Sequence, residues 1–221
     1  MQELRAGPFT SKDIDFQGDR IVARRCAELL AGTCYEENDP GRVTQAAKVV
    51  FRLGSKTCAI DFLSAPHGLD AAHVRRRSVL LRVPVGDQKI AFRVMHPVDC
   101  LKSRIKNVMG LPGYNTSQGI LQLRASIYCA REFIGDLARE SDPKRKRAAI
   151  NLSKEVHEFC IGDLHALQLY DTHAIDAFEA VMPHEGLPER FRTEHYPRMV
   201  QSLRDKRERY ARKNVVGPAS S

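Results

Sequence analysis

The hydrophobic pattern changes its period at His96-Pro97, and this change constrains the fold more than any other feature of the chain. Before it, apolar and polar residues alternate in short runs separated by glycine-containing turns, as in half-buried strands. After it, apolar residues recur at three- and four-residue spacing, as in amphipathic helices. We therefore expect an α+β protein, with a small mixed β-sheet domain over residues 1–95 and a helical bundle over residues 96–221.

Alternating runs predict strands in the N-terminal half over residues 10–16, 47–53, 57–63, 78–83 and 89–94. Gly54-Ser55-Lys56 and Gly86-Asp87 are expected to form hairpin turns, and the polar stretch 35–44 is expected to be a loop. Asp19 should cap a helix that ends at Gly32. The apolar residues of this helix share one face: Ile21, Val22, Cys26, Leu29 and Leu30.

The C-terminal half is expected to consist of helices. The apolar spacing predicts them over residues 98–109, 117–140, 143–160, 163–181 and 187–212. In this interpretation the first helix starts at His96-Pro97, with Asp99 as its cap, and Ser141-Asp142-Pro143 begins the third.

The net charge of +8 favours a polyanionic partner such as a nucleotide or RNA. Two basic runs, residues 144–147 and 204–213, hold much of the excess, although the alternating signs of the second run also fit the solvated face of a terminal helix. No apolar run reaches the ~18 residues that span a bilayer, and the N-terminus has no apolar signal region. We therefore expect a cytoplasmic protein without a membrane partner. The six cysteines form no C-x-x-C pair, so neither a zinc site nor a disulfide framework is expected.

Two carboxylates occur together in residues 11–16 (SKDIDF). Because residues two apart on a strand point to the same face, Asp13 and Asp15 project together, with the isoleucine between them on the opposite face. Neighbouring carboxylates repel each other, and a divalent cation between them removes that cost. Mg²⁺ prefers oxygen ligands of this kind, although a pair of solvated acids at a sheet edge has the same pattern.

A third acid, Asp61, lies in the apolar run 58–63 (CAIDFL). An acid in such a strand is unfavourable unless it is paired or bound to a metal. If this strand lies beside the first, the three acids form a triad for two Mg²⁺ ions, which activate an attacking hydroxyl and neutralise a leaving pyrophosphate. Asp13 and Asp15 then hold both metals and the triphosphate. Asp61 ligates the catalytic metal and helps to take the proton of the acceptor hydroxyl.

SKDIDF followed by CAIDFL resembles the nucleotidyltransferase superfamily, in which a strand with two acids precedes a strand with one. The segments RVMHPVDCLKSRIKNVMGL and QLRASIYCAREFI are similar to bacterial nucleotidyltransferase-like proteins and, more distantly, to the abortive-infection toxin branch. The resemblance spans roughly residues 9–160. It implies Mg²⁺-dependent transfer of a nucleoside monophosphate from an NTP to a hydroxyl of RNA, a protein or a small molecule. It also implies a cognate antitoxin-type partner.

The same resemblance implies a basic residue that faces the nucleotide phosphates on the helix after Pro97. Arg104 takes this position, where the toxin branch usually carries Lys, and Arg can grip phosphate with two hydrogen bonds. Lys102 is a second candidate on a different helix face, and either residue also fits a solvent-facing charge. Ser11 and Lys12 adjoin the acids and are further candidates for holding phosphate.

One departure from the family pattern concerns the residues before Asp13. The family places a Gly-Gly or Gly-Ser turn there, whose backbone N–H groups cradle the triphosphate. Only twelve residues precede Asp13 here, and none forms that pair. We therefore expect either further residues upstream or a truncated or degenerate copy. The alternative function is a catalytically inactive binding or regulatory module, and a third hypothesis is an RNA-binding helical protein driven by its basic charge.

Overall fold

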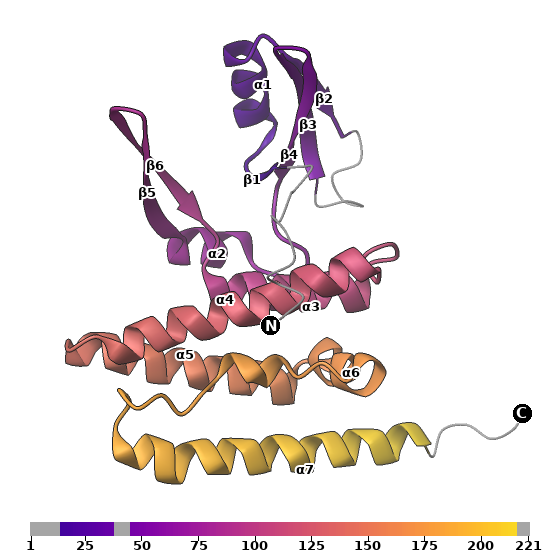
Figure 1. Cartoon of the computed structure of the whole chain (residues 1–221). Coiled ribbons are helices and arrows are strands. Elements are labelled where there is room, and N and C mark those ends of the chain that lie inside the picture. The colour runs from indigo at the N-terminus through magenta and orange to yellow at the C-terminus, as the bar shows by residue number, and fades with distance from the viewer. Residues whose placement is uncertain (1–13, 38–44, 216–221) are drawn as a thin grey trace, which may run out of the picture. The chain divides into compact units, whose positions relative to one another are not determined.

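The computed structural model describes residues 14–37 and 45–215 (Figure 1). The predicted site residues Ser11, Lys12 and Asp13 therefore lie outside the described residues. The chain forms two compact units that divide between Ser78 and Val79. The first contains a β-sheet and the second contains a hairpin followed by helices, so the protein is α+β as predicted. The boundary predicted at residue 95 coincides with the change from strands to helices. The two compact units divide earlier in the chain, so the hairpin before residue 95 belongs to the second unit.

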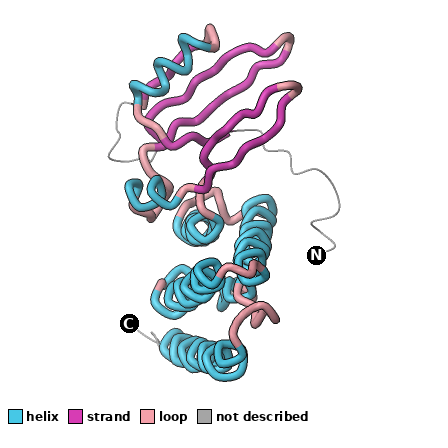
Figure 2. The backbone as a smooth tube through the Cα atoms, turned by 90° about the vertical axis from the view of Figure 1, so that its left-hand side faces the viewer, coloured by secondary structure: helices cyan, strands magenta, loops and turns pink. Residues whose placement is uncertain are grey.

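Four strands form the sheet of the first unit in the order β1-β4-β3-β2, and they are drawn in magenta in Figure 2. Their bounds are β1 Ile14–Gln17, β2 Thr33–Glu36, β3 Gln45–Leu53 and β4 Lys56–Leu63. β1 is parallel to β4, and the other neighbours are antiparallel. The predicted β3–β4 hairpin is confirmed, and Gly54 in its turn has a φ of 63°, which favours glycine. The strand β2 was not predicted, and its last two residues were assigned to the polar loop 35–44. A strand of four residues is too short to show a clear alternation.

Helix α1 (Arg20–Leu29) begins as predicted at Asp19, whose side chain accepts a hydrogen bond from the backbone N–H of Val22. The helix ends before Gly32, and this glycine is required by the close approach of β3. A Cβ atom at residue 32 would lie 2.6 Å from the carbonyl oxygen of Val50. A substitution at Gly32 must therefore displace the backbone of the neighbouring strand.

The face of α1 that packs on the sheet is its alanine face. Ala23 and Ala27 are buried in a small core with four residues of the sheet: Ala47, Val49, Ile60 and Phe62. Most of the apolar face identified from the sequence lies at the surface instead, where Ile21 and Leu29 are 73% and 70% exposed, and of this face Cys26 packs against the core. Alanine lets the helix backbone approach the sheet closely, so the larger side chains remain on the outer side.

The second unit begins with a two-stranded hairpin, β5 (Val79–Val85) and β6 (Gln88–Val94), close to the predicted strands. Its long helices are α3 Pro97–Gly110, α4 Ser117–Arg139, α5 Pro143–Gly162, α6 Leu164–His173 and α7 Tyr196–Val215. The helix α4 packs against both α3 and α5. Large apolar side chains of this unit are fully buried in one core, among them Leu101, Ile105, Leu123, Ile134 and Leu169.

Two details of the helical unit correct the sequence interpretation. The helix predicted over 163–181 is interrupted at Ala174, whose positive φ of 51° ends α6 before the short 3₁₀ turn η2 (Ala177–Ala180). The cap of α3 is His96, whose Nδ1 accepts a hydrogen bond from the N–H of Val98 at 3.2 Å. Asp99 is not the cap, because Pro97 occupies the first helical position and leaves Asp99 buried in the first turn.

In the part of the chain that the structure describes, no helix combines the length and apolarity needed to cross a bilayer.

Candidate metal site

Two of the three predicted acids lie opposite each other on neighbouring strands. Asp15 of β1 is paired in register with Asp61 of β4, which confirms that the two acidic strands are adjacent. Residues paired in this way point to the same face of a sheet, and neighbouring strands lie about 4.8 Å apart. Both carboxylates can therefore reach a single cation. Asp13, the third predicted acid, lies outside the described residues.

The acids project from the face of the sheet opposite α1. Ile60 and Phe62 flank Asp61 in β4, and both are buried in the core beneath α1. Because side chains alternate along a strand, Asp61 must point to the other face. Its side chain is 19% exposed, so the carboxylate is largely shielded from water but can still be reached.

Three contacts hold the short strand β1, which carries Asp15, at the edge of the sheet. The ring of Phe16 stacks on that of Phe62 with 6.0 Å between their centroids. The side-chain amide of Gln17 donates a 3.0 Å hydrogen bond to the carbonyl of Ala71, at the start of α2 (Ala71–Arg77). The backbone N–H of Gly18 donates to the carbonyl of Leu63 at 3.0 Å. These contacts fix the register that places Asp15 beside Asp61.

Asp61 is contacted by two residues of β3, neither of which was predicted as a site residue. The side-chain amide of Gln45 donates a 2.7 Å hydrogen bond to Asp61 Oδ1. The ammonium nitrogen of Lys48 lies 3.6 Å from the same oxygen, and Lys48 is the cross-strand partner of Asp61. The alternation of β3 marks Lys48 as outward-facing, but only the pairing of the strands shows that it is beside an acid.

The donor set fits Mg²⁺. Among residues 14–37 and 45–215, no group of three His, Cys, Asp or Glu side chains is placed to hold a metal, so the described part of the site consists of two carboxylates. Mg²⁺ is commonly bound through one or two carboxylates, with water and substrate phosphate oxygens as its other ligands. Asp15 and Asp61 would hold the ion.

The two basic residues predicted to face the nucleotide belong to the helical unit. Lys102 forms an ion pair with Glu155 at 2.6 Å, and its ammonium group lies 5.6 Å from the ring centre of Phe159. Arg104 donates a 2.9 Å hydrogen bond to the side-chain oxygen of Gln122. Lys102 is therefore mostly buried rather than solvent-facing. A contact of either residue with phosphate stays a prediction.

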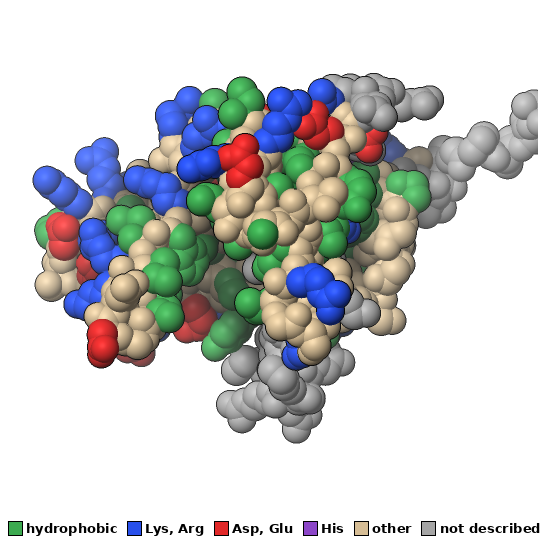
Figure 3. Space-filling model, turned by 90° about the horizontal axis from the view of Figure 1, so that it is seen from above, with side chains coloured by type: hydrophobic (Ala, Val, Ile, Leu, Met, Phe, Trp, Pro, Cys, Tyr) green, Lys and Arg blue, Asp and Glu red, His purple; other side chains and the backbone are tan. Residues whose placement is uncertain are grey.

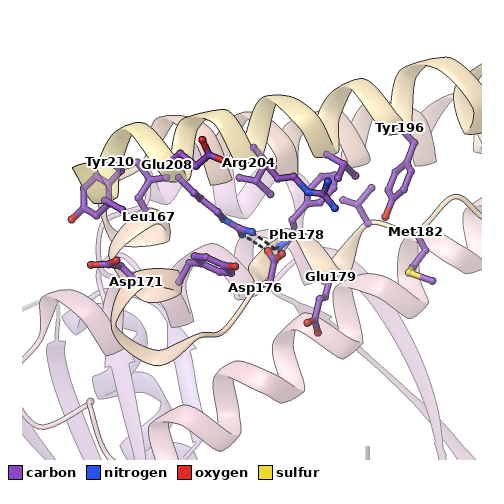
Figure 4. A pocket seen from close by; sticks show the side chains of 16 residues that line it. Leu167, Asp171, Asp176, Phe178, Glu179, Met182, Tyr196, Arg204, Glu208 and Tyr210 are labelled. Atoms are coloured by element: carbon purple, nitrogen blue, oxygen red, sulfur yellow. Dashed lines mark hydrogen bonds and ion pairs between the residues drawn. The ribbon is translucent and has the colours of Figure 1, made fainter. Parts of the chain in front are cut away.

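A cavity of about 580 Å³ lies among α6, η2 and α7 of the helical unit (Figure 4). Tyr196 and Tyr210 lie at its two ends, and burial raises the pKa of the Tyr196 hydroxyl. Arg207 of α7 donates two hydrogen bonds to Asp176, and its guanidinium carbon lies 3.7 Å from the ring centre of Tyr170. Of the predicted site residues that the structure describes (Asp15, Asp61, Lys102 and Arg104), none lines this cavity.

The ion pair between Arg207 and Asp176 is an exception within the basic run 204–213, in which most of the other charged side chains are exposed, as expected for a solvated face. The Arg207 side chain is mostly buried, and Asp176 also caps η2 by accepting a 2.8 Å hydrogen bond from the N–H of Phe178. Arg207 therefore joins α7 to the segment that follows α6. Its role in the described structure is to hold the helical unit together.

Arg207→Ala is expected to lower the free energy of unfolding by about 1–3 kcal/mol, because the Asp176 carboxylate loses its charged partner and Tyr170 loses its stacking contact. Chemical denaturation followed by circular dichroism measures this loss. The matched control is Arg212→Ala on the same helix, where an exposed pair with Glu208 at 3.5 Å should contribute only a few tenths of a kcal/mol. Equal losses in the two variants would contradict the assignment.

Comparisons with known proteins do not place the chain in a family. No protein-family model, no curated protein and no solved structure matches it. The chain is thus defined by its own fold and site, as an α+β protein whose sheet carries paired carboxylates on the face opposite its helix.

Proposed function

We propose that this protein is a metal-dependent nucleotidyltransferase, which moves a nucleoside monophosphate from an NTP to a hydroxyl acceptor. The observation that supports this proposal most is the pairing of Asp15 with Asp61 on adjacent parallel strands. It brings carboxylate oxygens from two strands to one place, as a cation that also binds phosphate requires. In this proposal Asp13, which precedes β1 in the sequence, completes the set of ligands.

The residues of the site have distinct roles in the proposed reaction. The acceptor oxygen forms a bond to the α-phosphorus while the bond from that phosphorus to pyrophosphate breaks. Asp61 takes the proton of the acceptor hydroxyl, and the hydrogen bond from Gln45 keeps its carboxylate oriented. Bound Mg²⁺ supplies Lewis-acid activation of the hydroxyl and neutralises charge on the pyrophosphate.

The charge of the protein suits an anionic substrate. The chain has a net charge of +8, and the face drawn in Figure 3 displays more Lys and Arg than Asp and Glu side chains. Such a surface attracts an NTP and also an RNA acceptor, with a strength that falls as salt is added. The charge therefore supports a nucleotide substrate, while the acceptor remains a hydroxyl of RNA, protein or a small molecule.

A second candidate function is a catalytically inactive binding or regulatory module. The contacts of Asp61 favour it, because the carboxylate already accepts a hydrogen bond from Gln45 and lies beside Lys48. An acid compensated in this way does not require a cation. The two functions differ in whether a divalent cation binds at the acids and supports transfer.

The proposed function is tested by incubating the full chain with each α-³²P-labelled NTP, together with total cellular RNA or protein. Mg²⁺ is present in one series and EDTA in the other. Label incorporated only with Mg²⁺ supports the enzyme and identifies its acceptor. No transfer from any NTP in either series supports the inactive module, and equal labelling with EDTA argues against both.

A further inference from the structure

We propose that Lys48 has two alternative partners at the carboxylate site. When no cation is bound it pairs with Asp61, and when a cation is bound it pairs with the triphosphate of the nucleotide. This inference rests on the proposed function, because it requires both a cation and a nucleotide at the acids. It adds a phosphate-binding residue on the sheet itself.

The register of the sheet places Lys48 in one row with the two acids. Asp15 pairs with Asp61 across β1 and β4, and Asp61 pairs with Lys48 across β4 and β3. Directly paired residues share a face, so all three side chains project from the face opposite α1. The row carries two negative charges and one positive charge on three successive strands.

The contact between Lys48 and Asp61 is loose. The 3.6 Å between Lys48 Nζ and Asp61 Oδ1 exceeds the distance of a hydrogen bond, and the Lys48 side chain is 43% exposed. Ion pairs with this exposure contribute little to stability. The contact between Gln45 and Asp61 is different, because it is a 2.7 Å hydrogen bond from an uncharged donor.

A divalent cation would displace Lys48 and leave Gln45 in place. The cation has twice the charge of an ammonium group and attracts both Asp15 and Asp61, whereas Lys48 lies beside Asp61 alone in the row. Gln45 carries no charge to repel it. The released Lys48 remains on the same face, where its flexible side chain can follow the negative oxygens of a triphosphate held by the cation.

Two of the basic residues expected to contact phosphate, both in the helical unit, have other contacts in the structure. Lys102 is paired with Glu155 at 2.6 Å, and Arg104 donates to Gln122 at 2.9 Å. Lys48 has the weaker contact, and it lies on the same sheet face as the acids. Moving Lys48 from the carboxylate to a phosphate therefore requires less free energy than breaking the ion pair between Lys102 and Glu155.

The test measures Mn²⁺ and inorganic tripolyphosphate binding to the full chain, with Mn²⁺ as a spectroscopic substitute for Mg²⁺. Removing the competing ammonium by Lys48→Ala should tighten Mn²⁺ binding about two- to five-fold, measured by electron paramagnetic resonance. The same variant should weaken binding of tripolyphosphate in the presence of Mn²⁺ by about ten-fold, measured by calorimetry. The uncharged variant Lys48→Gln should behave in the same way, and Lys48→Arg should retain tripolyphosphate binding.

The matched control is Lys56→Ala, which removes an exposed lysine at the start of β4, outside this row. It should leave both affinities within about two-fold of the unchanged protein. One contrary result is that Lys48→Ala and Lys48→Gln bind Mn²⁺ no more tightly than the unchanged protein, and another is that they bind tripolyphosphate as well as it does. Either result would show that Lys48 does not exchange between Asp61 and the triphosphate, while the proposed function stands. If the unchanged protein does not bind Mn²⁺, or if Asp61→Asn does not weaken that binding, the proposed function fails and this inference fails with it.

Discussion

Asp61→Asn is expected to reduce Mg²⁺-dependent transfer of the nucleoside monophosphate by about 10³-fold or more. The substitution preserves the shape of the side chain and an oxygen that can accept the hydrogen bond from Gln45. It removes the negative charge that holds the cation and the group that takes the acceptor proton. Transfer from labelled NTP measures the activity, and the loss should appear in the rate at saturating Mg²⁺ as well as in Mg²⁺ affinity.

The control for Asp61→Asn is Asp70→Asn in the same unit. Asp70 caps α2 by accepting a 2.6 Å hydrogen bond from the N–H of His73, and asparagine caps helices about as well as aspartate. Asp70→Asn should therefore keep both transfer and fold. Chemical denaturation should show that Asp61→Asn is also folded. Transfer by Asp61→Asn within a few-fold of the unchanged protein would exclude Asp61 from the reaction.

Leu123→Ala is expected to cause the largest loss of stability, about 3 kcal/mol or more in the free energy of unfolding. Leu123 lies on α4 and is 0% exposed, within the core that the helices of the second unit share. The substitution removes buried apolar surface and leaves a cavity that the surrounding helices fill only in part. Urea denaturation followed by circular dichroism at 222 nm, a wavelength that reports on helix, measures the effect.

The same substitution at Leu164 separates burial from residue type. Leu164 is 55% exposed in the first turn of α6, so Leu164→Ala removes the same atoms from a site that is already hydrated. We expect it to change the free energy of unfolding by less than about 1 kcal/mol. A Leu123→Ala variant no less stable than Leu164→Ala would show that α4 is not at the centre of this core.

Local patterns in the sequence predicted most of the secondary structure. Asp19 caps α1, Gly54 turns the β3–β4 hairpin, and α4 covers nearly the whole predicted range. Each of these depends on residues within a few positions of one another. The prediction was wrong where the tertiary structure departs from the local pattern. The helix over 163–181 ends at Ala174, and the outer face of α1 carries its largest apolar side chains.

The candidate site divides in the same way. Asp15 and Asp61 could be selected from the sequence because an acid in an apolar strand is unusual. Gln45 and Lys48 could not, because nothing near them in the sequence shows that they contact Asp61. Lys102 and Arg104 were selected by resemblance, and the structure shows side-chain partners for both that no local pattern indicated.

By itself, the sequence determined the α+β class, most of the succession of strands and helices, and which acids are candidates for a metal site. Tertiary structure decided the order β1-β4-β3-β2, the register that aligns Asp15, Asp61 and Lys48, and the alanine face by which α1 packs. The physical reason is the range of the forces involved. Periodicity and capping act between neighbours in the chain, whereas strand order and register depend on burying apolar side chains that are far apart in the sequence.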